Sequence, residues 1–325
     1  MRPDLLVDRM LRGDRLALAR LISLIENRSS ELLPIMARVQ QRSGNAHVIG
    51  VTGPPGSGKS TLVDQVITLY RQKGFKVGVV AIDPSSPFSG GAVLGDRIRM
   101  QDHAGDEGVF IRSLGSRGSR GGLSRATRDV VRLYGAFGMQ KILVETVGVG
   151  QTELDIMEVA DTTIVLLTPE SGDTIQTMKA GILEIADLFV VNKADREGAD
   201  RLQMELRSLV EIGGSDQGWD LPVLLAQASR GIGIRELVDL VEDHRTYLRS
   251  QQRKEGDQTF REETLEIVLD ELRKKIKIGR VENPYQAASE ILKEIPWPRL
   301  GVSTHRPRSS WPRSNRRPGK RSVRR

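Results

Sequence analysis

Short apolar runs alternate with longer amphipathic stretches through most of the chain. The predicted strands are 46–52, 77–82, 109–111, 141–145, 162–167, 188–192 and 222–225. Apolar side chains recur at helical spacing in 59–73, 124–138, 151–159, 174–185, 197–211 and 233–250. Apolar strands that alternate with helices are typical of a parallel sheet covered on both faces. The predicted fold class is therefore α/β, with a mainly parallel sheet and helices on both of its faces.

The segments outside this region have different patterns. Residues 5–33 carry leucine and isoleucine at helical intervals, which predicts two or three short N-terminal helices. Residues 261–276 show a similar periodicity, which predicts a C-terminal helical appendage. From residue 298 to the end the chain is rich in Pro, Ser and Arg without apolar periodicity, so we expect this tail to be disordered.

Residues 53–60 read Gly-Pro-Pro-Gly-Ser-Gly-Lys-Ser, a complete phosphate loop, between a predicted strand and a predicted helix. The glycines allow successive backbone N–H groups to point inward at phosphate oxygens, and the helix N-terminus adds the positive end of its dipole. Lys59 is expected to reach the β- and γ-phosphates, and the Ser60 hydroxyl to ligate Mg²⁺. A chance glycine-rich turn would not have these flanks. The sequence therefore predicts a P-loop NTPase.

A second motif follows the predicted strand 188–192, where the chain reads Asn192-Lys193-Ala194-Asp195. The carboxylate of Asp195 can accept two hydrogen bonds from guanine, whereas adenine has no such pair of donors. A site with buried polar groups rejects the wrong base, because those groups are left unpaired. Asn192 is expected to tether the loop, and the stem of Lys193 to lie over the base. A backbone amide of Gln227-Ala228-Ser229 could meet the guanine carbonyl oxygen. GTP and GDP are thus the predicted ligands.

Several acids are candidates for a magnesium site. The fourth predicted strand ends in Glu145, which can hold Mg²⁺ through water, and the amide of Gly148 can sense the γ-phosphate. Asp83 and Asp96 flank a glycine-bearing loop and could complete the oxygen shell of the ion, although turn or helix-cap roles fit their spacing equally well. Gln151 either orients the attacking water or caps the next helix.

Composition limits the other classes of function. The chain has no cysteine, which excludes disulfides, thiolate metal sites and thiol catalysis. It has no apolar run long enough to span a membrane, and its N-terminus lacks the apolar core of a signal peptide. We therefore expect a cytoplasmic protein without a membrane partner.

The net charge of +7 comes from the tail. Ten of the 49 basic residues lie in 298–325, and that segment has no acid. The remaining 39 basic residues are balanced by 42 acidic residues. A nucleic-acid-binding protein would need a basic face on its folded body, so we expect no nucleic-acid partner.

Taken together, the motifs resemble the methylmalonyl-CoA mutase-associated GTPases of the MeaB/ArgK type, which carry the older label of LAO/AO (lysine/arginine/ornithine) transport ATPases. The matching segments are 53–60, 83–86, 90–100, 145–151, 172–176, 179–182 and 192–195. The resemblance extends from the N-terminal helices to about residue 295. It implies a homodimeric, Mg²⁺-dependent GTPase that acts as a chaperone for an adenosylcobalamin-dependent acyl-CoA mutase, gating cofactor loading and protecting the mutase.

The resemblance also implies roles for individual residues. Asp83, Asp96 and Glu145 correspond to metal and switch acids, while Asp173 and Lys179 fall in a third switch that responds to the partner. The candidate catalytic residues are Lys59, Glu145, Gln151, Asp173 and Lys179. The candidate nucleotide-binding residues are Gly53, Pro54, Pro55, Gly56, Ser57, Gly58, Lys59, Ser60, Thr61, Gly148, Asn192, Lys193, Asp195, Gln227, Ala228 and Ser229, and the candidate metal ligands are Ser60, Asp83, Asp96 and Glu145.

Four segments are expected on this basis: an N-terminal helical segment (1–44), a P-loop GTPase domain (45–250), a C-terminal helical dimerisation segment (251–297) and the basic tail (298–325). Two departures from the family pattern stand out. Arg120 occupies a usually apolar position in the glycine-rich loop 113–122, and the tail does not resemble the family's C-terminus.

Two other functions were weighed. An ATPase or kinase linked to lysine/arginine/ornithine transport is disfavoured by Asn192–Asp195, and the Leu-Ser-Gly-Gly-Gln signature of ABC proteins is absent. A nickel-insertion GTPase would need a segment rich in His or Cys. The four histidines of this chain (His47, His103, His244 and His305) are scattered.

Overall fold

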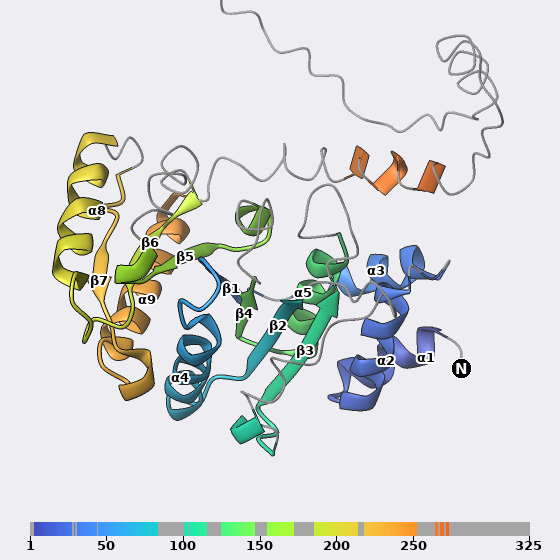
Figure 1. Ribbon diagram of the computed structural model, residues 1–325. Coiled ribbons are helices and arrows are strands. Elements are labelled where there is room, and N and C mark those ends of the chain that lie inside the picture. Colours follow the sequence, from blue (N-terminus) through green and yellow to red (C-terminus); the bar gives the residue numbers. More distant parts are fainter. Residues whose placement is uncertain are drawn as a thin grey trace, which may run out of the picture. The chain divides into compact units, whose positions relative to one another are not determined.

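The computed structural model describes residues 3–27, 29, 31–43, 45–83, 101–103, 105–115, 125–146, 155–171, 185–213 and 218–251, and a few positions between 264 and 272 (Figure 1). The chain divides into two compact units, Met1–Glu255 and Gly256–Arg325. The described positions of the second unit are helical. All other elements belong to the first unit.

The first unit is built on one seven-stranded parallel sheet in the order β3-β2-β4-β1-β5-β6-β7. The strands are β1 (His47–Thr52), β2 (Val77–Asp83), β3 (Val109–Gly115), β4 (Lys141–Glu145), β5 (Thr162–Leu167), β6 (Leu188–Val191) and β7 (Val223–Leu225). The described helices of this unit are α1 (Pro3–Leu11), α2 (Arg15–Glu26), α3 (Leu32–Gln40), α4 (Lys59–Gln72), α5 (Arg125–Phe137), α8 (Ala199–Gly213) and α9 (Ile234–Gln251). The predicted α/β class is confirmed.

Helices cover both faces of the sheet, because neighbouring residues of each strand point to opposite sides. Ile49, Leu143 and Ile164 pack with the apolar faces of α4 and α9 in one core. On the other face, α1, α2, α3 and α5 form a second core over β2 and β4, and α8 forms a third over β5, β6 and β7. In Figure 1 the three N-terminal helices (blue) lie together beside α5.

Two details of the predicted elements were wrong. Strand β3 continues through Gly115, four residues beyond its predicted end, so residues 113–115 are not part of a loop. The polar Arg112 interrupts the apolar pattern of this strand because its side chain bonds Glu26 and Ser23 of α2. The described part of the predicted helix 151–159 is a short 3₁₀ helix, Asp155–Glu158. No described helix is both long and apolar enough to cross a bilayer.

Candidate functional site

The carboxyl ends of all seven strands lie at one edge of the sheet, because the strands are parallel. Strands β2, β3 and β4 lie on one side of β1, with β4 next to it, and β5, β6 and β7 follow outward on the other side. Ligands of open α/β sheets bind at the carboxyl edge where the strand order reverses in this way. The phosphate loop follows β1 directly, at this reversal point.

Two positions in the phosphate loop require glycine. Gly53 has φ 140°, and a Cβ atom there would lie 2.1 Å from the backbone oxygen of Leu166 on β5. Gly58 has φ 96°, and a Cβ atom there would lie 2.5 Å from the side-chain nitrogen of Asn192. The loop thus packs against the next strand and against the Asn192–Asp195 segment so closely that no side chain fits between them.

Lys59 begins α4 and is only 7% exposed. Its Nζ atom donates hydrogen bonds to the carbonyl oxygens of Gly53, at 2.8 Å, and Pro54, at 3.1 Å. The ammonium group is therefore held inside the loop, where phosphate oxygens would be expected. The hydroxyl of Ser57 is buried and has no hydrogen-bond partner among the described residues. A buried polar atom without a partner is costly, and its position fits a loop built to surround a polar ligand.

Ser60 and Glu145 meet beneath the phosphate loop. The Ser60 Oγ donates to Glu145 Oε1 at 2.7 Å, and both side chains are buried. Thr146 continues from β4 and donates from its hydroxyl to Thr52 at the end of β1, at 2.9 Å. A hydroxyl and a carboxylate are oxygen donors of the kind that Mg²⁺ prefers. Ser60 and Glu145 therefore fit a magnesium ion.

Asn192 joins the phosphate loop to the segment after β7. Its Nδ2 donates to the carbonyl oxygen of Ser57 at 2.8 Å, and its Oδ1 accepts from the backbone N–H of Ala228 at 3.0 Å. The side chain is 3% exposed, so both bonds are shielded from water. Asn192 thereby couples the positions of the loops that follow β1, β6 and β7.

Substituting Asn192 with alanine is expected to lower the free energy of unfolding by about 2–4 kcal/mol, because two buried backbone groups would each lose their partner. GTP affinity is also expected to fall by about tenfold, although Asn192 is not expected to touch phosphate. Chemical denaturation and calorimetric titration of the variant would measure both effects. Asn45→Ala, which alters an asparagine at the opposite edge of the sheet, serves as the control. Unchanged stability in Asn192→Ala would show that the bridge contributes nothing.

Lys193 has φ 56°, the one positive φ of a non-glycine residue in the part of the chain that the structure describes. Two backbone hydrogen bonds fix this turn. The N–H of Ala194 donates to the carbonyl oxygen of Ala226 at 3.0 Å, and the N–H of Arg196 donates to the carbonyl oxygen of Lys193 at 2.9 Å. The side chain of Asp195 is exposed, with no partner recorded among the described residues. It is thus available to a ligand.

The segment Gln227–Ser229 was expected to supply a backbone amide to the base. The N–H of Gln227 donates to Ile232 at 3.0 Å, and that of Ala228 to Asn192 at 3.0 Å. Two of the three amides are thus engaged within the protein, which leaves Ser229 as the remaining candidate.

Arg196 and Glu170 form an ion pair that the sequence analysis missed. Glu170 lies in the short 3₁₀ helix Pro169–Ser171 after β5, and Arg196 directly follows Asp195. The hydrogen bond from Arg196 lowers the pKa of Glu170 to about 2. Adjacency of β5 and β6 in the sheet brings the two residues together, and nothing in the local sequence signals the contact.

Some predicted site residues cannot be placed. Asp96, Gly148, Gln151, Asp173 and Lys179 lie outside the described residues, as does the side chain of Asp83 at the end of β2. Within the described part of the chain, no group of three or more His, Cys, Asp or Glu side chains could hold a metal ion.

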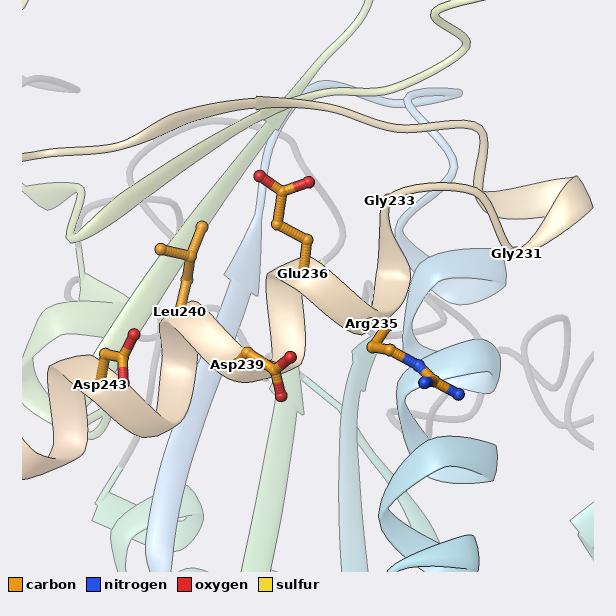
Figure 2. Close-up of a pocket in the computed structure, with 7 residues that line it drawn as sticks. All are labelled: Gly231, Gly233, Arg235, Glu236, Asp239, Leu240 and Asp243. Carbon is orange, nitrogen blue, oxygen red and sulfur yellow. The ribbon is translucent and has the colours of Figure 1, made fainter.

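A hollow of about 530 Å³ lies along the outer side of α9 (Figure 2). Its lining includes Glu236, Asp239 and Asp243 but only one cation, Arg235. Three carboxylates would repel a triphosphate. This hollow is therefore not a nucleotide site.

The comparisons with known proteins agree with this geometry. Residues 18–280 match the family model described as methylmalonyl Co-A mutase-associated GTPase MeaB. A protein of Pyrococcus abyssi named as a GTPase is 47% identical, over 90% of this chain and 96% of its own. GTPase ArgK of Escherichia coli is 35% identical, over 82% of this chain and 85% of its own.

A solved structure shows the same fold. The crystal structure of a LAO/AO transport system kinase superposes with a TM-score of 0.67 at 28% identity, over 84% of each chain. The described site lies within the 18–280 region that the family model matches. The chain therefore belongs to the methylmalonyl Co-A mutase-associated GTPase MeaB family, and it is a P-loop GTPase.

Proposed function

We propose that the protein is a Mg²⁺-dependent GTPase that acts as a chaperone for an adenosylcobalamin-dependent acyl-CoA mutase of the methylmalonyl-CoA type. In this role GTP binding and hydrolysis gate the loading of the mutase with its cofactor and protect the loaded enzyme. The observation that carries the GTPase half is the hydrogen-bonded bridge of Asn192 between the phosphate loop and the guanine segment. The mutase half is supported by the family, whose description names that enzyme.

In the proposed site, Lys59 neutralises phosphate charge and Ser60 ligates Mg²⁺, with Glu145 holding the ion directly or through water. Asp195 reads guanine. Bound magnesium would supply charge stabilisation to the transferring phosphoryl group, which passes through no covalent protein intermediate. Asp83, Asp96, Gly148 and Gln151 are proposed to complete the metal shell and the water-positioning machinery. Asp173 and Lys179 are proposed to belong to a switch that contacts the partner.

We further propose that the protein is cytoplasmic and forms a homodimer through residues 251–297. The other proposed segments are the N-terminal helical segment (1–44), the P-loop GTPase domain (45–250) and the basic tail (298–325). A second candidate is the energising kinase of an amino-acid transport system. The solved structure with the same fold is described as a LAO/AO transport system kinase, which favours this candidate. It predicts ATP as the nucleotide, whereas Asp195 predicts GTP, so competition between ATP and GTP for the purified protein separates the two.

The mutase partner can be tested by co-purification. The tagged full chain, loaded with a non-hydrolysable GTP analogue, with GDP or with neither, is passed over immobilised methylmalonyl-CoA mutase and isobutyryl-CoA mutase. Retention that depends on the nucleotide is expected with at least one of them. It should be lost in Asp195→Ala when the nucleotide concentration saturates only the wild type, because that variant binds the nucleotide more weakly. Absence of retention in all three nucleotide states would exclude the chaperone role while leaving the GTPase assignment intact.

A further inference from the structure

A buried polar cluster lies at the amino edge of the sheet, opposite to the phosphate loop. His47, Lys141 and Thr162 begin β1, β4 and β5, and they share strand faces with Ile49, Leu143 and Ile164. Their side chains therefore point toward α4 and α9. Each is at most 1% exposed. Three polar side chains in one buried layer need an explanation, since apolar residues would fill this space at lower cost.

A chain of two hydrogen bonds and one further polar contact runs through the cluster. His47 Nε2 lies 2.8 Å from Thr162 Oγ1, and the same oxygen lies 2.8 Å from Nδ1 of His244 on α9. His244 Nε2 in turn lies 3.3 Å from Oδ1 of Asp187, the residue before β6. Since the hydroxyl of Thr162 has one proton, it can donate to only one of the two imidazoles and must accept from the other. The other carboxyl oxygen of Asp187 accepts from the N–H of Thr163 at 2.7 Å, so only Oδ1 of Asp187 faces the chain.

The surroundings keep both imidazoles neutral. Burial, followed by the positive charges of Lys141, Arg245 and Arg249, lowers the pKa of His47 to about 3. Burial also lowers the pKa of His244 to about 4. In contrast, burial raises the pKa of Asp187 to about 6, so this carboxyl group is the titrating member nearest to neutral pH. The other charged or titratable groups packed against the cluster are Tyr70, Lys141, Asp161, Glu242, Arg245 and Arg249.

A pocket of about 350 Å³ opens at the His47 end of this chain. Its lining includes Arg245 and Arg249, which lie one turn apart on α9. Arg245 donates to the carbonyl oxygen of Asn45 at 2.8 Å, and its Nη1 atom lies 3.9 Å from Oε2 of Glu242. Arg249 is exposed, and no hydrogen bond or ion pair to it is recorded among the described residues. The pocket thus carries two cations.

Two other polar residues, His47 and Asp161, line this pocket. The Nδ1 atom of His47 is buried and has no hydrogen-bond partner. The carboxyl group of Asp161 accepts from the N–H of Val48 at 2.8 Å, and burial raises its pKa. The acid is therefore tied to the start of β1 by this bond.

We propose that this pocket binds a small oxyanion, a phosphate or a carboxylate, between the guanidinium groups of Arg245 and Arg249, with Nδ1 of His47 as a donor from the pocket floor. Guanidinium groups offer paired N–H donors to such oxygens. The bound anion would give the unsatisfied Nδ1 a partner. This site is distinct from the GTP site, which lies at the other edge of the sheet.

Binding of the oxyanion is coupled to uptake of one proton. With Asp187 ionised, Nε2–H of His244 donates to Asp187, and the Thr162 hydroxyl donates to Nδ1 of His244. Nε2–H of His47 then donates to the Thr162 oxygen, which leaves Nδ1 of His47 as an acceptor. When a proton from solvent neutralises Asp187, each bond reverses: Asp187 donates to His244, His244 to Thr162, and Thr162 to His47. Nδ1 of His47 then carries the N–H that an oxyanion needs. Affinity is expected to rise as pH falls toward the pKa of Asp187, by up to about tenfold per pH unit.

The test uses the full chain labelled with ¹³C and ¹⁵N in its histidines and saturated with Mg²⁺ and a non-hydrolysable GTP analogue, so that the phosphate loop is occupied. Sulfate represents phosphate and acetate represents carboxylate, because neither probe titrates near neutral pH. A saturable shift of the His47 imidazole signals is expected, and the tighter of the two probes assigns the chemical class of the ligand. Calorimetry in two buffers of different ionisation enthalpy should show uptake of one proton.

Three variants make the test specific. Arg249→Gln should weaken binding at least about tenfold, because one charged donor is lost. Arg235→Gln, at the opposite end of α9, should bind as the wild type does. Asp187→Asn should make the affinity independent of pH, since its amide can donate permanently to His244. The proposal would be overturned if His47 showed no saturable shift with either probe at tens of millimolar, or if Arg249→Gln bound as tightly as Arg235→Gln.

Discussion

Replacing Asp195 with alanine is expected to weaken GTP binding about 100- to 1,000-fold, because guanine would lose two hydrogen bonds to a charged acceptor. The carboxylate is exposed in the nucleotide-free protein, so its removal should change the free energy of unfolding by no more than about 0.5 kcal/mol. The loss of affinity would thus reflect base recognition and not a folding defect. Isothermal titration calorimetry with GTP, GDP and ATP measures it.

A neighbouring acid provides the control. Glu197 is also exposed and lies two residues further along the same loop, so Glu197→Ala should bind GTP as the wild type does. The conservative variant Asp195→Asn tests the chemistry directly, since its amide can donate to the second carbonyl of xanthine. This variant is expected to prefer xanthosine triphosphate to GTP. If ATP bound the wild type as tightly as GTP, the guanine assignment would be wrong.

Replacing Lys59 with methionine is expected to slow GTP hydrolysis about 100- to 1,000-fold, the usual effect of removing one charge-stabilising group from a transition state. The side chain is nearly buried, and its Nζ bonds the carbonyl oxygens of Gly53 and Pro54. Methionine keeps the aliphatic length and removes only the ammonium group. Single-turnover hydrolysis with saturating GTP and Mg²⁺ separates the loss of rate from any loss of affinity.

Lys73 offers a matched comparison, because it caps the C-terminus of the same helix and pairs with Asp239 at the surface. Lys73→Met should hydrolyse GTP at the wild-type rate. Equal rates in Lys59→Met and the wild type would remove Lys59 from the catalytic site, whatever the affinity.

Much of the fold could be predicted because the buried strands are apolar and bounded by turn residues. Residues 141–145 and 162–167 are strands with the predicted bounds. The end of β3 could not be predicted, since its Arg112 and Ser113 are polar and only the contact with α2 makes the arginine compatible with a strand. Strand order also depends on long-range packing, which local periodicity does not encode.

Those residues of the candidate site that belong to recognisable motifs could be predicted from the sequence. The motifs placed Lys59, Glu145 and Asn192 at or after the ends of predicted strands. In the structure Glu145 bonds Ser60, and Asn192 bonds the phosphate loop that holds Lys59. The partners of each side chain depend on three-dimensional adjacency. The donation of the Ala228 amide to Asn192 and the ion pair of Glu170 with Arg196 both connect neighbouring strand ends. The motif predicted that Asn192 tethers its loop, but it did not identify Ala228 as a partner, and nothing in the sequence signalled the ion pair.

The left-handed turn at Lys193 has a consequence for the speed of nucleotide capture. A residue with a Cβ atom adopts this conformation at a cost of about 1 kcal/mol, so the surrounding hydrogen bonds of Ala194 and Arg196 must impose it during folding. The backbone at Lys193 therefore does not have to change its conformation when guanine binds. The rate of GTP binding should accordingly be limited by diffusion and by the phosphate end of the site, and not by rearrangement of the backbone around the base.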